Sequence, residues 1–272
     1  MKQLKDLIKI AAFDVDGTIL PNGTTQFSTN TRKIFPLLKM NGITTVISSA
    51  REFATIGDFL DQLAPVDYFI GANGAFIFDN NKKEFVYKNT LKRDEVIKVY
   101  NAFKDKVAAF AVTDFDKVFK TPSMNLNSWF IRPFVSNYYN FDESLLSSDD
   151  LYVITLNVEG SDEIAKEVSK FLEDNNLNME ISAKWSRGIF IGPKNVSKSH
   201  TLNILCSMLG YEIDKNLIAF GDSSNDYEML RDAYYGVAME RANEWIKGVA
   251  NDIALDCEYD GAYLKLKELK LI

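Results

Sequence analysis

Short apolar runs alternate with segments of helical periodicity over the first seventy residues of the chain. An apolar run of roughly four to eight residues is typical of a buried strand, and apolar residues at i, i+3 and i+4 are typical of an amphipathic helix. Strands that alternate with helices predict a parallel sheet with helices on its faces, an α/β fold. In chain order, the predicted elements are strand Ile8–Phe13, helix Thr29–Lys39, in which Pro36 is expected to shift the start or cause a kink, strand Ile43–Ser48, helix Glu52–Leu63 and strand Tyr68–Ile70.

The pattern changes after Asn73-Gly74. A hairpin of Ala75–Phe78 and Glu84–Tyr87 is predicted, with its turn at Asn80-Asn81. The next segment lacks the regular alternation and predicts a separate α+β module. Its predicted elements are a helix capped by Thr90 and ending near Lys106, a hairpin of Ala108–Val112 and Val118–Thr121, strand Leu151–Val158, helix Asp162–Asn175 and strand Met179–Lys184.

The alternation resumes after this module. Its predicted elements are helix Ser197–Leu209, strand Leu217–Phe220, helix Asp226–Arg231, strand Tyr235–Ala238, helix Glu244–Val249, strand Asp252–Leu255 and a helix after Gly261. We therefore predict a discontinuous core domain of residues 1–82 and 188–272. Residues 83–187 form an inserted module of about a hundred residues, a normal domain size.

Composition excludes several kinds of protein. A net charge of −7 without a Lys/Arg cluster argues against nucleic-acid binding. The two cysteines, Cys206 and Cys257, are too few for a disulfide framework or a thiolate zinc site. No stretch approaches the roughly 20 apolar residues of a membrane span, and the N-terminal pattern is not that of a signal peptide. We expect a cytoplasmic protein that is not membrane-bound, with a monomer as the default.

A single histidine, His200, limits the chemistry that the chain can support. Metal sites with two histidines are impossible, so acid–base catalysis is expected to depend on carboxylates. His200 itself is interpreted as a helix-surface residue.

Two aspartates, Asp14 and Asp16, directly follow the first apolar run, before Gly17-Thr18. Carboxylates this close at the end of a buried strand repel each other unless a cation lies between them. Oxygen ligands of this kind suit Mg²⁺. The first twenty residues therefore predict a metal site and a nucleophile.

Three further sets of polar residues lie at strand ends or helix starts. Open parallel sheets bind their ligands at the carboxyl ends of their strands. Alone, each set is more often a turn, a helix cap or a solvated residue, but their joint order favours one site. The sets are Ser48-Ser49-Ala50-Arg51, Lys198, and Gly221-Asp222-Ser223-Ser224-Asn225-Asp226.

Other conspicuous residues are interpreted as structural. Asp114 and Asp116 share the spacing of Asp14 and Asp16, but they lie between two hairpin strands and predict a turn. Four aromatic residues of the inserted module are interpreted as core rather than as a substrate pocket: Trp129, Phe130, Tyr138 and Tyr139.

Four segments of the chain resemble the four motifs of the haloacid dehalogenase (HAD) superfamily. They are Asp14-Val-Asp-Gly-Thr, Ser48-Ser-Ala-Arg, Lys198 and Gly221-Asp-Ser-Ser-Asn-Asp. The chain further resembles the Cof-type phosphatases of this superfamily at four places: Asn73-Gly74, Met229-Leu230, Val237-Ala238-Met239 and Asp260-Gly261. The resemblance covers the predicted core in order, and the inserted module falls where those proteins carry a C2B-type cap. It implies a Rossmann-like parallel-sheet core with an inserted α+β cap.

The chain departs from this family in two places. Ser49-Ala50-Arg51 stands where the family usually has Thr-Gly-Arg. Ser49 keeps the hydroxyl group of the family's threonine. Glu240-Arg241-Ala242 stands where the family usually has Gly-Asn-Ala, so a role for that asparagine is not carried over.

The resemblance implies a Mg²⁺-dependent phosphohydrolase acting on a small phosphorylated metabolite, such as a sugar phosphate. Asp14 would be the nucleophile that forms an aspartyl-phosphate, and Asp16 the general acid and base. The metal would be held by Asp14, Asp16 through its backbone carbonyl, and Asp222, with Asp226 behind or beside them. Ser49, Lys198 and Asn225 would hold the phosphoryl oxygens.

Two alternative functions remain open at this point. A phosphomutase shares the first motif and the cap type, although its last motif is usually longer than Gly221–Asp226. A non-catalytic sensor of phosphometabolites has no need of the paired acids Asp14 and Asp16. The residues that select the substrate, the substrate itself and the oligomeric state are not given by the sequence.

Overall fold

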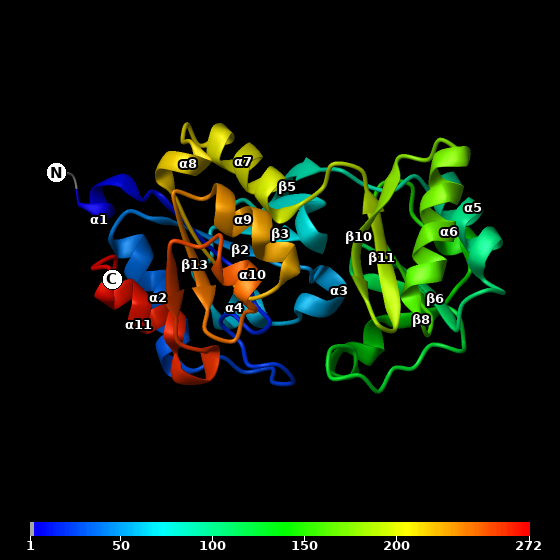
Figure 1. Ribbon diagram of the computed structural model, residues 1–272, viewed down its shortest axis with the longest axis horizontal. Helices are drawn as coiled ribbons and strands as arrows, with labels where there is room; N and C mark the ends of the chain where they lie inside the picture. The colour runs from blue at the N-terminus through cyan, green and yellow to red at the C-terminus, as the bar shows by residue number, and fades with distance from the viewer. Residues whose placement is uncertain (1–2) are drawn as a thin grey trace. The chain divides into compact units, whose positions relative to one another are not determined.

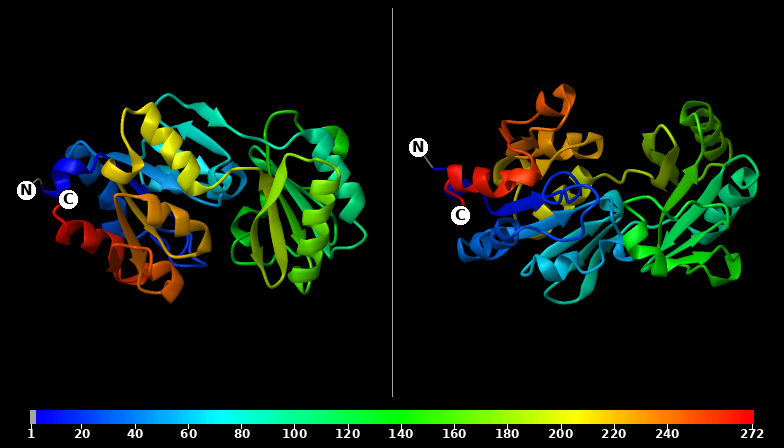
Figure 2. Two further views of the ribbon diagram at one scale, coloured as in Figure 1. Left: turned by 45° about the horizontal axis from the view of Figure 1, so that its top comes forward. Right: turned by 90° about the horizontal axis from the view of Figure 1, so that it is seen from below.

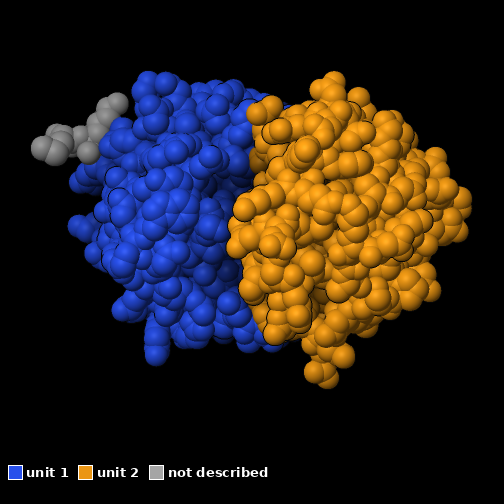
Figure 3. Space-filling model, turned by 45° about the vertical axis from the view of Figure 1, so that its right-hand side comes forward, with its two compact units in different colours: residues 1–50, 58–87, 197–272 blue, residues 51–57, 88–196 orange. Residues whose placement is uncertain are grey.

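The computed structural model describes residues 3–272 and contains two compact units (Figure 1, Figure 3). The first unit contains the described residues up to Ala50, together with Asp58–Tyr87 and Ser197–Ile272. The second unit contains Arg51–Gly57 and Lys88–Val196. The domain limits inferred from the sequence, with residues 83–187 as the insert, stay a prediction.

The first unit is built on an eight-stranded sheet of order β14-β13-β12-β1-β2-β3-β4-β5. From β14 to β3 the neighbouring strands are parallel, whereas β4 pairs antiparallel with β3. The predicted parallel sheet is therefore confirmed. Its strands are β1 (Ile10–Phe13), β2 (Thr44–Ser48), β3 (Tyr68–Gly71), β4 (Phe76–Asp79), β5 (Glu84–Lys88), β12 (Leu217–Gly221), β13 (Tyr235–Met239) and β14 (Asp252–Ala254).

Helices connect these strands, and α2 lies beside α11 in the chain's tertiary structure (Figure 1). Pro36 is accommodated inside α2, whose start at Thr29 is as predicted. The helices of this unit are α1 (Leu4–Leu7), α2 (Thr29–Met40), α4 (Phe59–Gln62), α7 (Lys198–Met208), α8 (Ile213–Asn216), α9 (Tyr227–Asp232), α10 (Glu244–Lys247) and α11 (Gly261–Glu268), with 3₁₀ turns at Ala72–Gly74, Ser224–Asp226 and Cys257–Tyr259.

Side chains of β1 alternate between the two faces of the sheet, as the strand geometry requires. Ile10 and Ala12 belong to a fully buried cluster that includes Leu202 of α7 and Met229 of α9. Burial of a large apolar side chain such as Ile10 or Leu202 stabilises a fold by about 1.5–3 kcal/mol. The apolar run at the start of the sequence is thus the centre of the core, and its last residue leads directly into Asp14.

The second unit contains a six-stranded sheet of order β10-β11-β9-β6-β7-β8, antiparallel except for the β7–β8 pair. Two helices, α5 and α6, lie on one face of this sheet (Figure 1, Figure 2). Its elements are β6 (Ala109–Asp114), β7 (Lys117–Lys120), β8 (Tyr138–Asn140), β9 (Leu151–Asn157), β10 (Met179–Trp185), β11 (Gly188–Pro193), α3 (Phe53–Ile56), α5 (Arg93–Phe103) and α6 (Ser161–Asp174), with 3₁₀ turns at Arg132–Asn137 and Glu143–Leu145.

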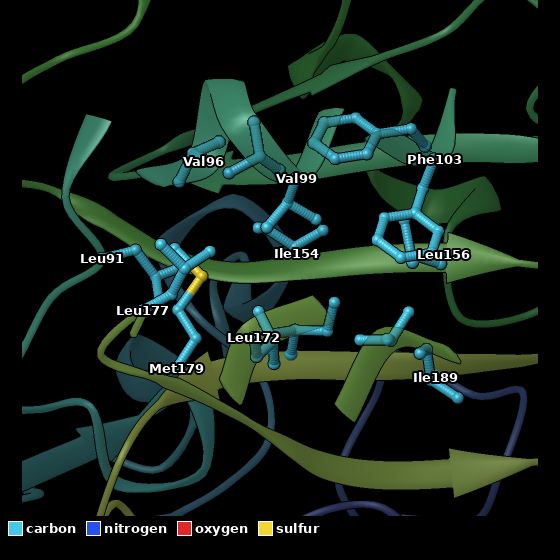
Figure 4. Close-up of a cluster of buried hydrophobic side chains, with 14 of the residues drawn as sticks. Leu91, Val96, Val99, Phe103, Ile154, Leu156, Leu172, Leu177, Met179 and Ile189 are labelled. Carbon is cyan, nitrogen blue, oxygen red and sulfur yellow. The ribbon is translucent and has the colours of Figure 1, made fainter. Parts of the chain in front are cut away.

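The helices of the second unit cover an apolar sheet face (Figure 4). Val99 and Phe103 of α5 and Leu172 of α6 are buried in one cluster with Ile154 and Leu156 of β9. The cluster gives this unit a hydrophobic core of its own, as the mixed pattern of the sequence predicts.

The segment Arg51–Gly57 belongs to the second unit, and its polar side chains are buried among that unit's residues. Glu52 accepts hydrogen bonds from Thr55 Oγ1 at 2.7 Å and from Thr113 Oγ1 of β6 at 3.3 Å. Arg51 donates to the Thr55 carbonyl oxygen at 2.7 Å, and its guanidinium carbon lies 4.3 Å from the centroid of the Phe130 ring. Burial raises the pKa of Glu52, although the hydrogen bond from Thr55 opposes the shift.

The single helix predicted over Glu52–Leu63 is wrong. The chain forms two short helices, α3 and α4, which are separated at Gly57 with φ 55° and ψ −133°. This backbone conformation is readily available to glycine alone. A Cβ atom at Gly57 would lie 2.6 Å from the ring of Phe134, so a larger residue does not fit there.

One more expectation about the second unit is wrong, and one of its strands was missed. Thr90 does not cap α5, which begins at Arg93, because Leu91 is held in a β-bridge with Leu151. The strand β11 was not predicted, since Gly188 and Gly192 weaken its strand pattern. Pairing on both sides, with β9 and β10, makes the segment a strand despite its glycines.

The aromatic residues of the second unit are less buried than predicted. Trp129 and Tyr139 are 47% and 46% exposed, so their interpretation as core is wrong. Phe130 packs on Arg51, and Tyr138 packs on the small cluster around Val118. Two of the four residues are therefore surface features.

Two structural interpretations are confirmed. Asp114 ends β6, and Phe115 has φ +50° in the turn before β7. His200 is exposed on α7. Of the helices described within residues 3–272, none combines the length and apolarity needed to cross a membrane.

Asp67, at the amino end of β3, holds several elements of the first unit together. Its carboxylate accepts hydrogen bonds from the backbone nitrogen and hydroxyl of Thr45 at 3.0 Å each, from Lys39 at 2.9 Å and from Asn81 at 3.1 Å. Burial alone would raise the pKa of Asp67, but these hydrogen bonds outweigh burial and lower it.

Replacement of Asp67 by Asn is expected to lower the free energy of unfolding at pH 7 by about 1–3 kcal/mol. Because the folded-state pKa is lowered, this stabilisation is present above the unfolded pKa of about 4 and is lost as the pH falls through the folded pKa. Urea unfolding of both proteins at pH 7 and at pH 3 measures the difference. Asp105→Asn, at an exposed position, is the control and should change stability by less than about 0.5 kcal/mol.

Candidate active site

The candidate site is built on the carboxyl ends of β12, β1 and β2, which are neighbours in the sheet. The backbone nitrogen of Asp14 donates to the Phe220 carbonyl oxygen at 3.0 Å, which extends the β1–β12 pairing by one residue. The chain then turns, and Val15 accepts hydrogen bonds from the nitrogens of Thr18, Ile19 and Leu20. The sheet therefore fixes the position of Asp14, and the tight turn ends the strand.

Three carboxylates meet around one ammonium group. Oxygen atoms of Asp14, Asp222 and Asp226 lie within 4.8 Å of one another. Lys198 Nζ donates to Asp14 Oδ1 at 2.6 Å and to Asp226 Oδ1 at 2.7 Å. The Lys198 side chain is completely buried, as is that of Asp226. Lysine is rarely buried unless it is paired, and here two carboxylates pair with it.

Ser197 fixes the position of Lys198 in the chain's secondary structure. The Ser197 hydroxyl accepts a hydrogen bond from the His200 backbone nitrogen and caps α7, so Lys198 is the first residue of the helix. Sequence reasoning placed Lys198 at a helix start, and the structure agrees.

Burial dominates the electrostatics of the cluster. Burial raises the pKa of Asp14, an effect that Lys198 opposes and that the charges of Asp226 and Asp222 increase. Burial likewise raises the pKa of Asp222, with Asp226 adding to the shift. The pKa of Lys198 is raised: burial favours the neutral amine, but Asp14 and Asp226 outweigh it. Three carboxylates against one ammonium leave excess negative charge that a cation would neutralise.

A divalent metal fits this donor set. Carboxylate oxygens are the ligands that Mg²⁺ and Ca²⁺ prefer, and the cluster offers neither thiolate nor imidazole. Asp16 is half-buried, and its carboxylate is not one of the three that cluster among residues 3–272. The side chains of Asp14 and Asp16 therefore occupy different environments, although one residue separates them.

Gly17 leaves the space in which Asp222 lies. A Cβ atom at Gly17 would be 2.3 Å from Asp222 Oδ2, and the residue has φ +85°. Thr18 Oγ1 lies 3.1 Å from Asp14 Oδ2 and 3.4 Å from Asp222 Oδ1, so its hydroxyl connects the two carboxylates. The Gly17-Thr18 pair therefore shapes the acidic cluster.

Both carboxylate oxygens of Asp226 are engaged. Oδ2 accepts from the backbone nitrogens of Asp222 and Ser223 at 3.0 Å each, and Oδ1 accepts from Lys198. Asp226 thus holds the loop that carries Asp222 and orients the ammonium group of Lys198.

The structure brings Ser49 and Asn225 together through a third residue, Asn73. Ser49 is buried, and its carbonyl oxygen accepts from the Asn73 backbone nitrogen at 3.0 Å. Asn225 Nδ2 donates to Asn73 Oδ1 at 2.9 Å. By contrast, the Ser48 hydroxyl is buried without a hydrogen-bond partner among the described residues.

Sequence reasoning missed three contributors to the site. Thr18 was noted only as part of a motif, although a hydroxyl four residues after Asp14 could have indicated its contact. Asn73 was noted only as a family signature. Arg241, one of the departures from that signature, lowers the pKa of Asp222 through its charge; its distance along the chain gave no signal.

The chain is similar in sequence to known hydrolases. A model of the haloacid dehalogenase-like hydrolases matches residues 11–266. This match confirms the resemblance drawn from the four sequence motifs. Two curated relatives are phosphatases of 5-amino-6-(5-phospho-D-ribitylamino)uracil. YcsE of Bacillus subtilis is 26% identical over 90% of this chain and 89% of its own length, and YbjI of Escherichia coli is 27% identical over 89% of each.

Solved structures show the same fold. The HAD phosphatase BT1666 of Bacteroides thetaiotaomicron superposes with a TM-score of 0.81 at 22% identity, over 98% of this chain and 96% of that protein. The HAD subclass IIB sugar phosphatase BT4131 has a TM-score of 0.79 at 22% identity, over 97% and 100%. The predicted fold class, a parallel-sheet HAD core with an α+β cap, is confirmed.

Replacement of Gly17 by Ala is expected to displace Asp222 and to abolish most of the activity while the protein stays folded. Gly42→Ala is the matched control, because Gly42 has φ +71° but no described atom lies within 4 Å of its added Cβ. Both variants carry a similar backbone strain of about 1–3 kcal/mol, so a loss of activity confined to Gly17→Ala would come from the displaced Asp222 carboxylate. Phosphatase assays and urea unfolding of both variants check this. Equal activities in the two would contradict the role of the Gly17 space.

Proposed function

Since the chain belongs to the haloacid dehalogenase-like hydrolases and is a phosphatase, we propose that it releases phosphate from a small phosphorylated metabolite with the help of Mg²⁺. The proposed route passes through an aspartyl-phosphate, an acyl phosphate formed on Asp14. The observation that carries the proposal is the acidic cluster of Asp14, Asp222 and Asp226 around the buried Lys198.

Asp14, Asp222 and the backbone carbonyl of Asp16 would hold the metal, with Asp226 beside them. The excess negative charge of the cluster and its oxygen-only donors support this assignment. When bound, the metal would neutralise charge on the phosphoryl group and on the carboxylates. Because Asp226 already accepts three hydrogen bonds, we assign it mainly to the positioning of Lys198 and Asp222.

In the proposed first step, an oxygen of Asp14 attacks phosphorus and the bond from phosphorus to the substrate oxygen breaks. Asp16 gives its proton to that oxygen, and the alcohol leaves. Lys198 and Thr18 lie on the two oxygens of Asp14, at 2.6 and 3.1 Å, and orient the carboxylate for attack. The half-buried position of Asp16, outside the cluster, supports its separate role as acid.

In the proposed second step, water attacks phosphorus and gives a proton to Asp16. The bond between phosphorus and Asp14 breaks, which frees phosphate and restores both side chains. Ser49, Lys198 and Asn225 hold the phosphoryl oxygens throughout. Their donors oppose the negative charge, and such placement is the main source of catalysis in phosphoryl transfer.

The proposed substrate is the phosphate monoester of a sugar or of a sugar alcohol. The names of the similar proteins support this class, since two act on a phosphoribityl compound and one is a sugar phosphatase. 5-Amino-6-(5-phospho-D-ribitylamino)uracil is therefore the first compound to test.

The wild-type protein is expected to release phosphate from members of a panel of sugar phosphates, phosphoribityl compounds and nucleotides only when Mg²⁺ is present. Asp14→Asn removes the nucleophile and should reduce release to the background of the preparation. Asp16→Asn should lower kcat by about 10²–10⁴-fold, the usual contribution of general acid–base catalysis. Colorimetric phosphate detection, with chelator-treated enzyme as control, measures all three. Movement of phosphate within the substrate without release would indicate a mutase, and binding without turnover would indicate a sensor.

Ser49→Ala is expected to lower kcat/KM by about 10- to 100-fold, because it removes a hydrogen bond to a charged group. Ser48→Ala is the neighbouring control. Within residues 3–272 the buried Ser48 hydroxyl has no hydrogen-bond partner, so its removal should leave kcat/KM unchanged and stability equal or higher. Steady-state kinetics and urea unfolding distinguish the two. Equal effects of both substitutions would contradict the phosphate-binding role of Ser49.

A further inference from the structure

The 3₁₀ turn Ala72–Gly74 between β3 and β4 is strained. Ala72, Asn73 and Gly74 have φ of +50°, +58° and +111°. Positive φ at a non-glycine residue costs of the order of 1–3 kcal/mol, and such strain persists where the surroundings impose it. Asparagine tolerates this region better than most residues. The turn is nevertheless fully buried, so the rest of the site holds it in place.

We propose that Asn73 is a positioning residue, which connects Ser49 to Asn225 and fixes the orientation of the Asn225 amide toward the phosphoryl group. The inference rests on the proposed phosphate-binding roles of Ser49 and Asn225. It assigns a task to a residue that no catalytic motif includes.

The backbone of the turn holds Ser49. Asn73 N donates to the Ser49 carbonyl oxygen at 3.0 Å, and Ser49 N donates to the Ile70 carbonyl oxygen at 2.9 Å. Both backbone groups of Ser49 are therefore engaged by the segment of β3 and the turn. This arrangement fixes the point at which the chain leaves β2.

The side chain of Asn73 holds Asn225. Asn225 Nδ2 donates to Asn73 Oδ1 at 2.9 Å, and the Ser223 hydroxyl lies 2.8 Å from Asn225 Oδ1. An amide nitrogen carries two hydrogens. One of them is used by Asn73, and within residues 3–272 the other has no protein partner. The two contacts set the plane of the amide and leave one N–H for a phosphoryl oxygen.

Gly74 extends the same turn to the helix that carries Lys198. Thr201 Oγ1 donates to the Gly74 carbonyl oxygen at 2.6 Å. A Cβ atom at Gly74 would lie 2.5 Å from the Ser197 carbonyl oxygen. One three-residue turn thus contacts all three elements that bear the proposed phosphate-binding residues.

The test uses Asn73→Gly, which keeps the positive φ and the backbone donor to Ser49 and removes the side chain with its acceptor Oδ1. The wild-type protein, Asn73→Gly, Asn225→Ala and the double variant form a double-mutant cycle. Two quantities are measured for each protein. The first is kcat/KM with the best ester of the panel, and the second is the affinity for inorganic phosphate, measured by ³¹P NMR in the presence of Mg²⁺. Asn176→Gly is the matched control, because Asn176 also has positive φ but is exposed on the second unit.

Asn73→Gly is expected to weaken phosphate binding and lower kcat/KM by about 5- to 10-fold, as loss of one hydrogen bond implies. In the Asn225→Ala background the same substitution should have no further effect, since Asn73 acts through Asn225. A purely structural role would lower stability and leave these effects additive. Additive effects, or phosphate binding that Asn73→Gly leaves unchanged, would overturn the inference.

Ser223→Ala provides a second route if Asn73→Gly proves unfolded in urea and circular dichroism measurements. It removes the other contact of the Asn225 amide and should weaken phosphate binding, again without effect in the Asn225→Ala background. A wild-type protein that binds phosphate but hydrolyses no ester would refute the proposed reaction alone, and the binding cycle would still test Asn73. A wild-type protein that binds no phosphate would overturn the positioning inference as well.

Discussion

The buried ammonium group of Lys198 is the interaction on which the site depends. It lies 2.6 Å from Asp14 and 2.7 Å from Asp226, with its side chain completely excluded from solvent. Without it, the three carboxylates would lie together with no ammonium group between them. Removal of one partner of a buried ion pair typically costs about 3–5 kcal/mol. The ammonium group of Lys198 offsets the repulsion between the carboxylates and also orients Asp14, the proposed nucleophile. The same residue therefore contributes to stability and to the proposed chemistry.

Elements far apart in the sequence reach this ammonium group because the sheet order is β12-β1-β2. Asp14 follows β1, Asp222 follows β12, and Lys198 begins α7. The nitrogens of Asp222 and Ser223 donate to Asp226, which also accepts from Lys198. The position of each charged group is therefore determined by the backbone of another element. A change in the backbone at one strand end would therefore shift the charged groups that the other elements carry.

The sequence contained the elements of the core and the charged residues of the site. Apolar runs such as Ile8–Phe13 are strong signals, and the fourfold motif identified Asp14, Lys198 and Asp222. What it lacked were contacts set by tertiary structure. Arg241, which follows another strand, lowers the pKa of Asp222 through its charge. At Gly57, where the predicted helix is broken, the ring of Phe134 leaves no room for a side chain. Strand β11 exists because two neighbours pair with it, which local propensity does not record.

The space at Gly17 has a consequence for the interpretation of related sequences. A side chain at this position would occupy the place of the Asp222 carboxylate, with a Cβ 2.3 Å from its oxygen. A relative could thus retain every acidic residue of the site and still lack a working one. Replacement of this glycine is therefore a sign of an inactive relative that the count of its aspartates does not give. Gly17 is a residue with no functional group, and its contribution is the space that it leaves for the Asp222 carboxylate.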